Sequence, residues 1–422
     1  MKKLLLLSGW LIFSLQILSQ NSITLSACYE KAIANYPLLQ QDALLASSNE
    51  LTLKNLNKNY LPQMNLNGQA HYQSDVTKVP IQDIPVFGIE PLDKDWYKIM
   101  LDVNQVIYDG NATSRQKKLE EVNHEINKQN LEIEQYNLKV RINEIYFSII
   151  LLNENKNIIE LHHSTLQAKL KEVESGVKNG VILASNQDIL FAEILNIEQS
   201  LEELEISRNS AISIMNEYTA LELNTSTQFI LPEVDFYIQE VENNRPEYQL
   251  MSIQQKKLEA SKHLIGSKNL PRLSAFGQAG YGRPGYDMLK NQFDDFYMIG
   301  ARLSWRFWDW NHSRKEKEIL GLQQNIISTK KETFDKNIRI DLEQKLANIN
   351  KTEAKISRDK QIIEIRNRIA KASSSQLDNG TITSTEYLTE LNSASKAKLD
   401  HELHKIELLK AKLDYQTTLG NL

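Results

Sequence analysis

One stretch of sequence occurs twice in this chain of 422 residues. Residues 60–72 read YLPQMNLNGQAHY, and residues 269–281 read NLPRLSAFGQAGY. Farther along, the pairs Trp96-Tyr97 and Asn179-Gly180 recur as Phe296-Tyr297 and Asn379-Gly380. A period of about 200 residues is too long for a solenoid repeat and indicates a duplicated architecture.

The duplication predicts how the chain is divided. We expect a first structural repeat at 20–219 and a second at 245–422. Between them, residues 220–244 lose the apolar periodicity and contain Pro232, which predicts an irregular inter-repeat segment.

The N-terminus has the pattern of an export signal. Lys2 and Lys3 precede an apolar run from Leu4 to Leu18, which is too short to span a membrane and predicts a signal peptide at 1–19. No later segment is apolar for long enough to span as a helix, so we expect an exported protein without a helical anchor.

The single cysteine, Cys28, allows two interpretations. Residues 25–28 spell a lipobox (LSAC), which would make Cys28 a lipidated N-terminus. However, the polar run 19–22 separates this tetrapeptide from the apolar core of the signal, and the following sequence predicts a helix that begins at Thr24. We therefore favour a half-buried helix cysteine, with lipidation as the alternative.

A sustained heptad pattern predicts long helices in both repeats. In the first repeat its apolar positions are Leu131, Leu138, Ile145, Leu152, Ile159, Leu166 and Val173. At 1.5 Å per residue, such a helix would be on the order of 100 Å long. Each long helix is followed by Asn-Gly, at Gly180 and Gly380, and then by a second apolar-periodic segment. Each repeat therefore contains a helical hairpin with its tip at that glycine.

Apolar and polar residues alternate in four further segments, at about 63–73, 96–108, 272–282 and 296–308. Alternation over about ten residues with aromatic residues at the ends is typical of transmembrane β-strands. Four strands cannot close a barrel, and lipid does not tolerate an open edge, so these strands would require other copies of the chain. The alternative is two antiparallel hairpins packed on a soluble core. If the strands form a barrel, their polar face lines its lumen, with Lys98, Asp102, Arg302 and Arg306.

Other chemistries find little support in the sequence. A net charge of −5 and a pI near 6.0 provide no basic surface for nucleic acid. Residues 280–285 match G-x-G-x-x-G, but Pro284 interrupts the turn and no helix follows, so we predict a hairpin loop. His162-His163 and His401 with His404 are expected on solvated helix faces rather than at a metal. We expect no catalytic activity, no cofactor and no metal.

The order of these elements, together with several short motifs, resembles the TolC family of outer-membrane efflux proteins over nearly the whole chain after the signal. The motifs are Asn59-Tyr60-Leu61-Pro62, Tyr108-Asp109-Gly110, Asn35-Tyr36-Pro37, Gly180 with Asp188-Ile189-Leu190, and Gly380 with Glu386-Tyr387-Leu388. The second repeat departs from the pattern where Trp310 replaces Gly110.

The resemblance implies an α+β membrane protein. Three chains would together form a twelve-stranded β-barrel in the outer membrane, continued through the periplasm by a barrel of long antiparallel helices. It further implies a periplasmic adaptor (membrane fusion protein) and an inner-membrane pump of the RND or ABC type, which dock at the tips. In the family an acidic residue shortly after the tip glycine lines the periplasmic entrance. Glu386 matches that position, Asn186 replaces it in the first repeat, and Asp188 is displaced by two residues.

The functional hypothesis is therefore the outer-membrane channel of a tripartite efflux or type I secretion system, which acts as a passive duct. The alternative is a soluble periplasmic coiled-coil adaptor or scaffold. The sequence does not identify the substrate, which could be a drug, a metal ion or a secreted protein.

Overall fold

A computed structural model of the chain describes residues 22–76, 92–234, 236, 244–288 and 290–422. The predicted signal peptide lies outside these residues. Within them, no helix is both long and apolar enough to cross a membrane.

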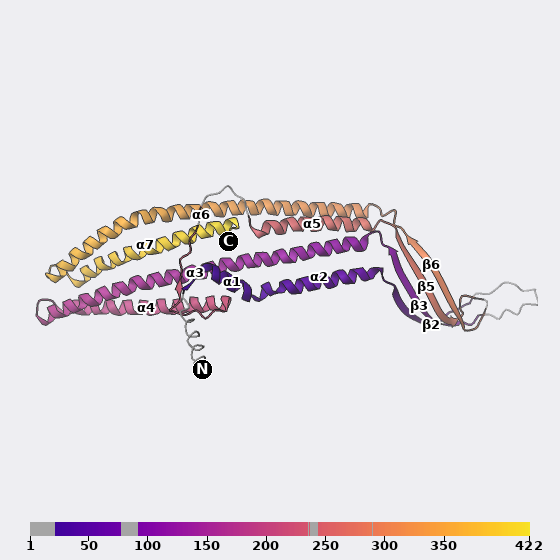
Figure 1. The fold of residues 1–422 in the computed structure, drawn as a ribbon, viewed down its shortest axis with the longest axis horizontal. Coiled ribbons are helices and arrows are strands. Elements are labelled where there is room, and N and C mark those ends of the chain that lie inside the picture. The colour runs from indigo at the N-terminus through magenta and orange to yellow at the C-terminus, as the bar shows by residue number, and fades with distance from the viewer. Residues whose placement is uncertain (1–21, 77–91, 235, 237–243, 289) are drawn as a thin grey trace, which may run out of the picture. The chain divides into compact units, whose positions relative to one another are not determined.

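The main elements described up to residue 219 are two short helices, the strands of one hairpin and two long helices (Figure 1). In order these are α1 (Leu25–Asn35), α2 (Gln41–Asn57), β2 (Gln63–Tyr72), β3 (Asp95–Tyr108), α3 (Ala112–Lys178) and α4 (Ala184–Thr219). Helix α1 begins where the sequence predicts, because the Thr24 hydroxyl accepts a hydrogen bond from the Ala27 amide at 3.3 Å and caps the helix.

The main elements described after residue 244 are one shorter helix, the strands of a second hairpin and two long helices. These are α5 (Pro246–Ser267), β5 (Arg272–Arg283), β6 (Asp294–Ser304), α6 (His312–Asp378) and α7 (Ser384–Leu419). Helices α3 and α6 each have 67 residues, and α4 and α7 each have 36. The helix-rich fold with a few antiparallel strands confirms this part of the predicted fold class.

The chain divides into two compact units that cut across the predicted repeats. Unit 1 comprises Met1–Gln41, Asn130–Tyr248 and Glu332–Leu422, and unit 2 comprises Asp42–Gln129 and Gln249–Lys331. Each unit thus takes segments from both halves of the sequence. The contacts group the two helical hairpins together and the four strands together.

Unit 1 is helical and has its largest core around α1 and α3. The side chains of Leu138, Ile142, Tyr146 and Phe147 are fully buried there. Residues 220–234 are mostly irregular, as predicted, apart from β4 (Gln228–Phe229), which pairs in parallel with β1 (Ser22–Ile23). The Tyr146 hydroxyl lies 2.9 Å from the Ile23 carbonyl oxygen and 2.6 Å from that of Ile230, so the irregular segment is fixed to the helical core.

Cys28 lies in this core. Its side chain is fully buried, deeper than the half-buried position predicted, and burial raises the pKa of its thiol to about 12. A buried thiol of this kind behaves as a small apolar side chain.

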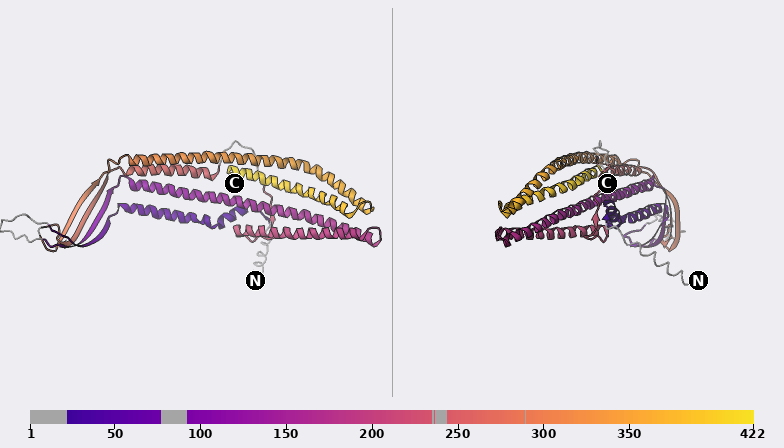
Figure 2. Two further views of the ribbon diagram at one scale, coloured as in Figure 1. Left: turned by 180° about the vertical axis from the view of Figure 1, so that it is seen from behind. Right: turned by 60° about the vertical axis from the view of Figure 1, so that its left-hand side comes forward.

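Unit 2 consists of a four-stranded antiparallel sheet and the helical segments that lead to and from it (Figure 2). The strand order is β2-β3-β5-β6, so β3 and β5 join the two halves of the chain and β2 and β6 are the edges.

Strand β6 is shorter than predicted. It ends at Ser304 rather than near Trp308, and Ser304 pairs with Arg272, the first residue of β5. The residue before Arg272 is Pro271, which has no N–H to donate, so the ladder between β5 and β6 cannot continue.

Candidate functional site: hairpin tips and polar sheet face

Both hairpin tips of unit 1 are built on a glycine in the left-handed region. Gly180 has φ +71° and Gly380 has φ +66°, and an added Cβ would meet no atom within 4 Å at either position. At the first tip the Gly180 amide donates to the Val177 carbonyl at 3.0 Å, and the Val181 amide donates to that of Gly176 at 2.9 Å. The second tip repeats this pattern. Both are Schellman motifs, so the glycines are required by backbone conformation and not by lack of space.

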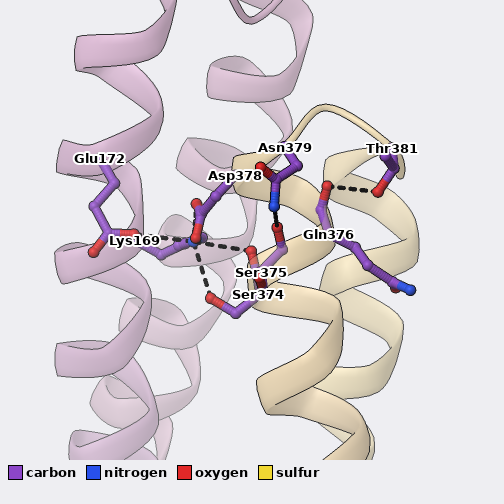
Figure 3. A network of polar contacts seen from close by, with 8 residues as sticks. All are labelled: Lys169, Glu172, Ser374, Ser375, Gln376, Asp378, Asn379 and Thr381. Atoms are coloured by element: carbon purple, nitrogen blue, oxygen red, sulfur yellow. Dashed lines mark hydrogen bonds and ion pairs between the residues drawn. The ribbon is translucent and has the colours of Figure 1, made fainter.

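A lysine connects the two hairpins close to these tips. The Lys169 side chain on α3 is only 4% exposed. Its Nζ donates to Oδ1 of Asp378 at 2.5 Å and to Oγ of Ser374 at 2.9 Å, both on α6, and to Oε2 of Glu172 at 2.9 Å on its own helix (Figure 3). The ring of Tyr387 on α7 lies 5.5 Å away. We call these contacts the Lys169 latch.

The carboxylates determine the charge of the latch. Burial by itself lowers the pKa of Lys169, but the hydrogen bonds and charges of Asp378 and Glu172 outweigh burial and raise this pKa above its usual value. Lys169 is therefore a cation at neutral pH, and its charge is compensated by carboxylates that are about half exposed.

The two acids predicted at the entrance, Glu386 and Asp188, lie in different surroundings. The Glu386 carboxylate accepts hydrogen bonds from the Thr383 amide at 2.8 Å and the Thr383 hydroxyl at 3.0 Å, and so completes a capping box at the start of α7. These bonds lower the pKa of Glu386. Asp188 is exposed on α4.

Asn186, at the position where the resemblance predicts an acid in the first repeat, forms a link between the hairpins. Its Oδ1 accepts a hydrogen bond of 3.0 Å from the backbone amide of Ser384, in the first turn of α7. The Asn186 side chain is neutral, so this contact between the two hairpin tips involves no charged group.

A third link involves a histidine that we expected in solvent. His162 on α3 is partly buried, its Nε2 lies 2.9 Å from Oδ1 of Asn392, and its Nδ1 lies 2.8 Å from Oγ of Ser395, both on α7. The Asn392 amide nitrogen donates to Glu193 on α4 at 2.8 Å. Burial lowers the pKa of His162.

The expectation of solvated faces is also wrong for His401 and His404. Their side chains are 14% and 16% exposed and both face Asp359, with His404 Nδ1 at 2.8 Å from Oδ2. Both histidines lie on α7, on the side that faces α6. The spacing of the two histidines in the sequence does not reveal this contact between helices. Among the described residues, no group of three or more potential ligands is arranged to hold a metal ion.

In unit 2 the strand register puts polar residues on one face of the sheet. Asp102 pairs with Asn65 on one side and Gln278 on the other, so these residues share a face. Its two carboxylate oxygens accept hydrogen bonds of 2.5 Å from the side-chain amides of Asn67 and Gln278. Lys98 and Arg302 lie on the same face by register. Arg306 lies beyond the end of β6 and is exposed.

Part of the loop after β5 folds back onto this polar face. The Tyr286 hydroxyl donates to Oε1 of Gln278 at 3.0 Å, and its ring lies 4.6 Å from that of Phe296. Lys98 Nζ lies 5.0 Å and 4.5 Å from the centroids of these two rings. The loop predicted from G-x-G-x-x-G thus begins later than expected, since Gly280 and Gly282 belong to β5.

The opposite face of the sheet is apolar and exposed. The large side chains exposed on it are Met64, Leu66, Tyr72, Tyr97, Ile99, Leu101, Tyr281, Tyr297, Ile299 and Leu303. Phe293 stacks on Tyr281 at one end of this face, but among the described residues no helix or loop covers the ten side chains. In the described sheet, β2 and β6 each pair with one strand only.

Comparisons with solved structures identify the fold. The outer-membrane channel OprN superposes with a TM-score of 0.70 at 14% identity, over 94% of this chain and 90% of that one. VceC of Vibrio cholerae gives 0.69 at 12% identity, over 94% and 96%. The open state of the MtrE channel of Neisseria gonorrhoeae gives 0.63 at 13% identity, over 94% and 88%. No protein-family model and no curated relative matches the sequence.

The chain therefore has the fold of TolC-like outer-membrane channels, and the resemblance stated from the sequence is confirmed at the level of the fold.

Sequence reasoning did not find the Lys169 latch. A signal exists, however, because Lys169 lies one helical turn from both Leu166 and Val173 and so interrupts the buried heptad stripe of α3.

Proposed function

We propose that this chain is one protomer of a homotrimeric outer-membrane duct that exports substrates. The observation that carries the proposal is the exposed apolar face of the sheet, which lies opposite a polar face. Because a sheet in water would not leave ten large apolar side chains uncovered on one face, the natural solvent for this face is lipid.

The open edges support the trimer. In lipid, unpaired backbone groups at the edges of β2 and β6 would each cost several kcal/mol, so the edges must pair with other copies of the chain. Four strands from each of three chains would form a twelve-stranded barrel with the polar face turned to the lumen. The matching lengths of α3 with α6 and of α4 with α7 further support an origin by duplication.

The hairpin tips would form the periplasmic entrance and the docking site for a periplasmic adaptor, which connects the duct to an inner-membrane pump of the RND or ABC type. The two tips differ in their chemistry. The first exposes the large apolar side chains of Val181 and Leu183, whereas Thr381 and Thr383 at the second have hydroxyls that are hydrogen-bonded within the turn. We assign the main adaptor contact to Val181 and Leu183, since exposed apolar side chains gain free energy when a partner covers them.

Opening would separate the hairpins. The Lys169 latch, the Asn186 contact and the His162 cluster all join residues of the first hairpin to residues of the second, and we assign them the role of holding the entrance closed. Transport through the duct would be passive and would need no catalytic group and no cofactor.

The alternative of a soluble coiled-coil scaffold is disfavoured by the same face of the sheet. A soluble protein with this surface would aggregate or would need a further domain to cover it. No described residue provides such a cover.

The experiment is to purify the protein in detergent, measure its mass, and add it to planar lipid bilayers. A trimer that produces discrete conductance steps is expected. A monomer that is soluble without detergent and gives no conductance would contradict the proposal.

A further inference from the structure

A basic cavity lies where β5 begins and β6 ends. It has a volume of about 340 Å³ and is lined by Lys268, Leu270, Arg272, Ser304 and Arg306. Every charged residue that lines this cavity is a cation. Cations gathered at one place on a channel wall bear directly on which ions can pass.

The strand register places the arginines on the polar face. Arg272 pairs with Ser304, and Arg302 pairs with Ser274, in the same alternation as Asp102. Arg306 follows Ser304 by two residues and lines the same cavity. All three arginines are exposed, and none forms an ion pair with a described residue. The guanidinium of Arg302 lies 5.2 Å from the centroid of the Phe276 ring.

No described carboxylate forms an ion pair with the three arginines. Asp102 accepts hydrogen bonds from two neutral side-chain amides and keeps its charge, but it is not paired with any of the arginines. Asp294 is at the opposite end of β6. Asp309 accepts hydrogen bonds from the Ser313 amide and the Asn269 side chain, and Glu316 pairs with Lys268 at 3.3 Å. Among the described residues, the three arginines therefore have no carboxylate partner, and the cavity at the end of β6 is lined by cations without an acid.

A water-filled lumen with walls of low dielectric constant concentrates the field of such charges and enriches ions of the opposite sign. Guanidinium groups also match carboxylate and phosphate in geometry, because they can donate two parallel hydrogen bonds. A trimer would repeat the three arginines around the lumen.

We propose that Arg272, Arg302 and Arg306 make the duct selective for anions and that its substrates carry carboxylate or phosphate groups. This inference rests on the proposed function, since it takes the polar face of the sheet as the wall of the lumen.

The test is the reversal potential of the protein in planar bilayers under a KCl gradient. We expect the native protein to pass Cl⁻ in preference to K⁺. The triple variant Arg272→Gln, Arg302→Gln, Arg306→Gln should shift the reversal potential towards that of K⁺, with a several-fold fall in the permeability ratio. The triple arginine-to-lysine variant keeps the charge and should keep the preference. Arg306 lies outside the strand ladder, so the single variant Arg306→Gln should not affect folding. It should shift the reversal potential in the same direction as the triple glutamine variant.

The substrate class is tested with citrate as a probe of carboxylate binding. Citrate should reduce the current of the native protein and leave that of the triple glutamine variant nearly unchanged. A native protein that prefers K⁺, an unchanged potential in the glutamine variant, or a native current unaffected by citrate would overturn the inference. Absence of any conductance would instead contradict the proposed function.

Discussion

Lys169 donates a hydrogen bond of 2.5 Å to Asp378, and this contact connects α3 of the first hairpin to the last residue of α6 in the second. The ammonium is buried, whereas the carboxylate is half exposed. In the proposed duct, this contact would favour the closed arrangement and would remain accessible to water when the hairpins separate.

Replacing Lys169 with Ala should loosen the tips. Loss of the charged hydrogen bonds, after allowance for screening of the exposed carboxylates, should cost about 1–2 kcal/mol. We expect a higher basal conductance in planar bilayers and a lower midpoint of thermal unfolding. Lys118→Ala is the matched control, since Lys118 has a similar ion pair with Glu121 on one helix and is mostly exposed. Equal effects of the two variants would contradict the role of the latch.

Glu386 combines a predicted role at the entrance with an observed role as a helix cap. Glu386→Ala removes both and should raise basal conductance. Glu386→Gln keeps an oxygen that can complete the capping box but removes the charge, so it separates the two roles. If the charge lines the entrance, the Gln variant changes the conductance as Ala does. If only the cap matters, the Gln variant conducts like the native protein.

The lowered pKa of His162 predicts a dependence on pH. The unfolded chain binds a proton more tightly at this position than the folded protein does, so stability is highest above the usual histidine pKa of about 6.5 and falls as the pH drops through that value towards the lower folded pKa. The unfolding midpoint should decrease between pH 7.5 and pH 5 more in the native protein than in His162→Gln. Parallel decreases in the two proteins would show that other groups are responsible.

Sequence reasoning located the elements because their signals are local. The alternation of residues 63–72 and the heptads of α3 depend only on which side chains share a face, and the tip glycines depend only on φ. The end of β6 was missed because it depends on a proline in the neighbouring strand. The division into two units was missed because it depends on contacts between distant segments.

The candidate site was harder to predict for the same reason. Lys98, Asp102 and Arg302 were placed on one face by alternation alone. By contrast, the Lys169 latch needs α3 and α6 to lie side by side, and the fold of the Tyr286 loop needs a tertiary hydrogen bond. The Glu386 cap was readable in principle, since Thr383 and Glu386 have the spacing of a capping box.

In the proposed duct, the apolar face of the sheet meets lipid and the polar face meets water in the lumen. Ile299 is 82% exposed on the apolar face, and its neighbour Met298 is exposed on the polar face. Each can be changed to Cys and labelled with a nitroxide, because the native thiol of Cys28 is buried. The accessibility of each label to oxygen and to a water-soluble nickel complex is then measured in lipid vesicles. We expect oxygen to collide more often with the label at 299 and nickel more often with the label at 298. Equal access of nickel to both labels would contradict a lipid-facing apolar surface.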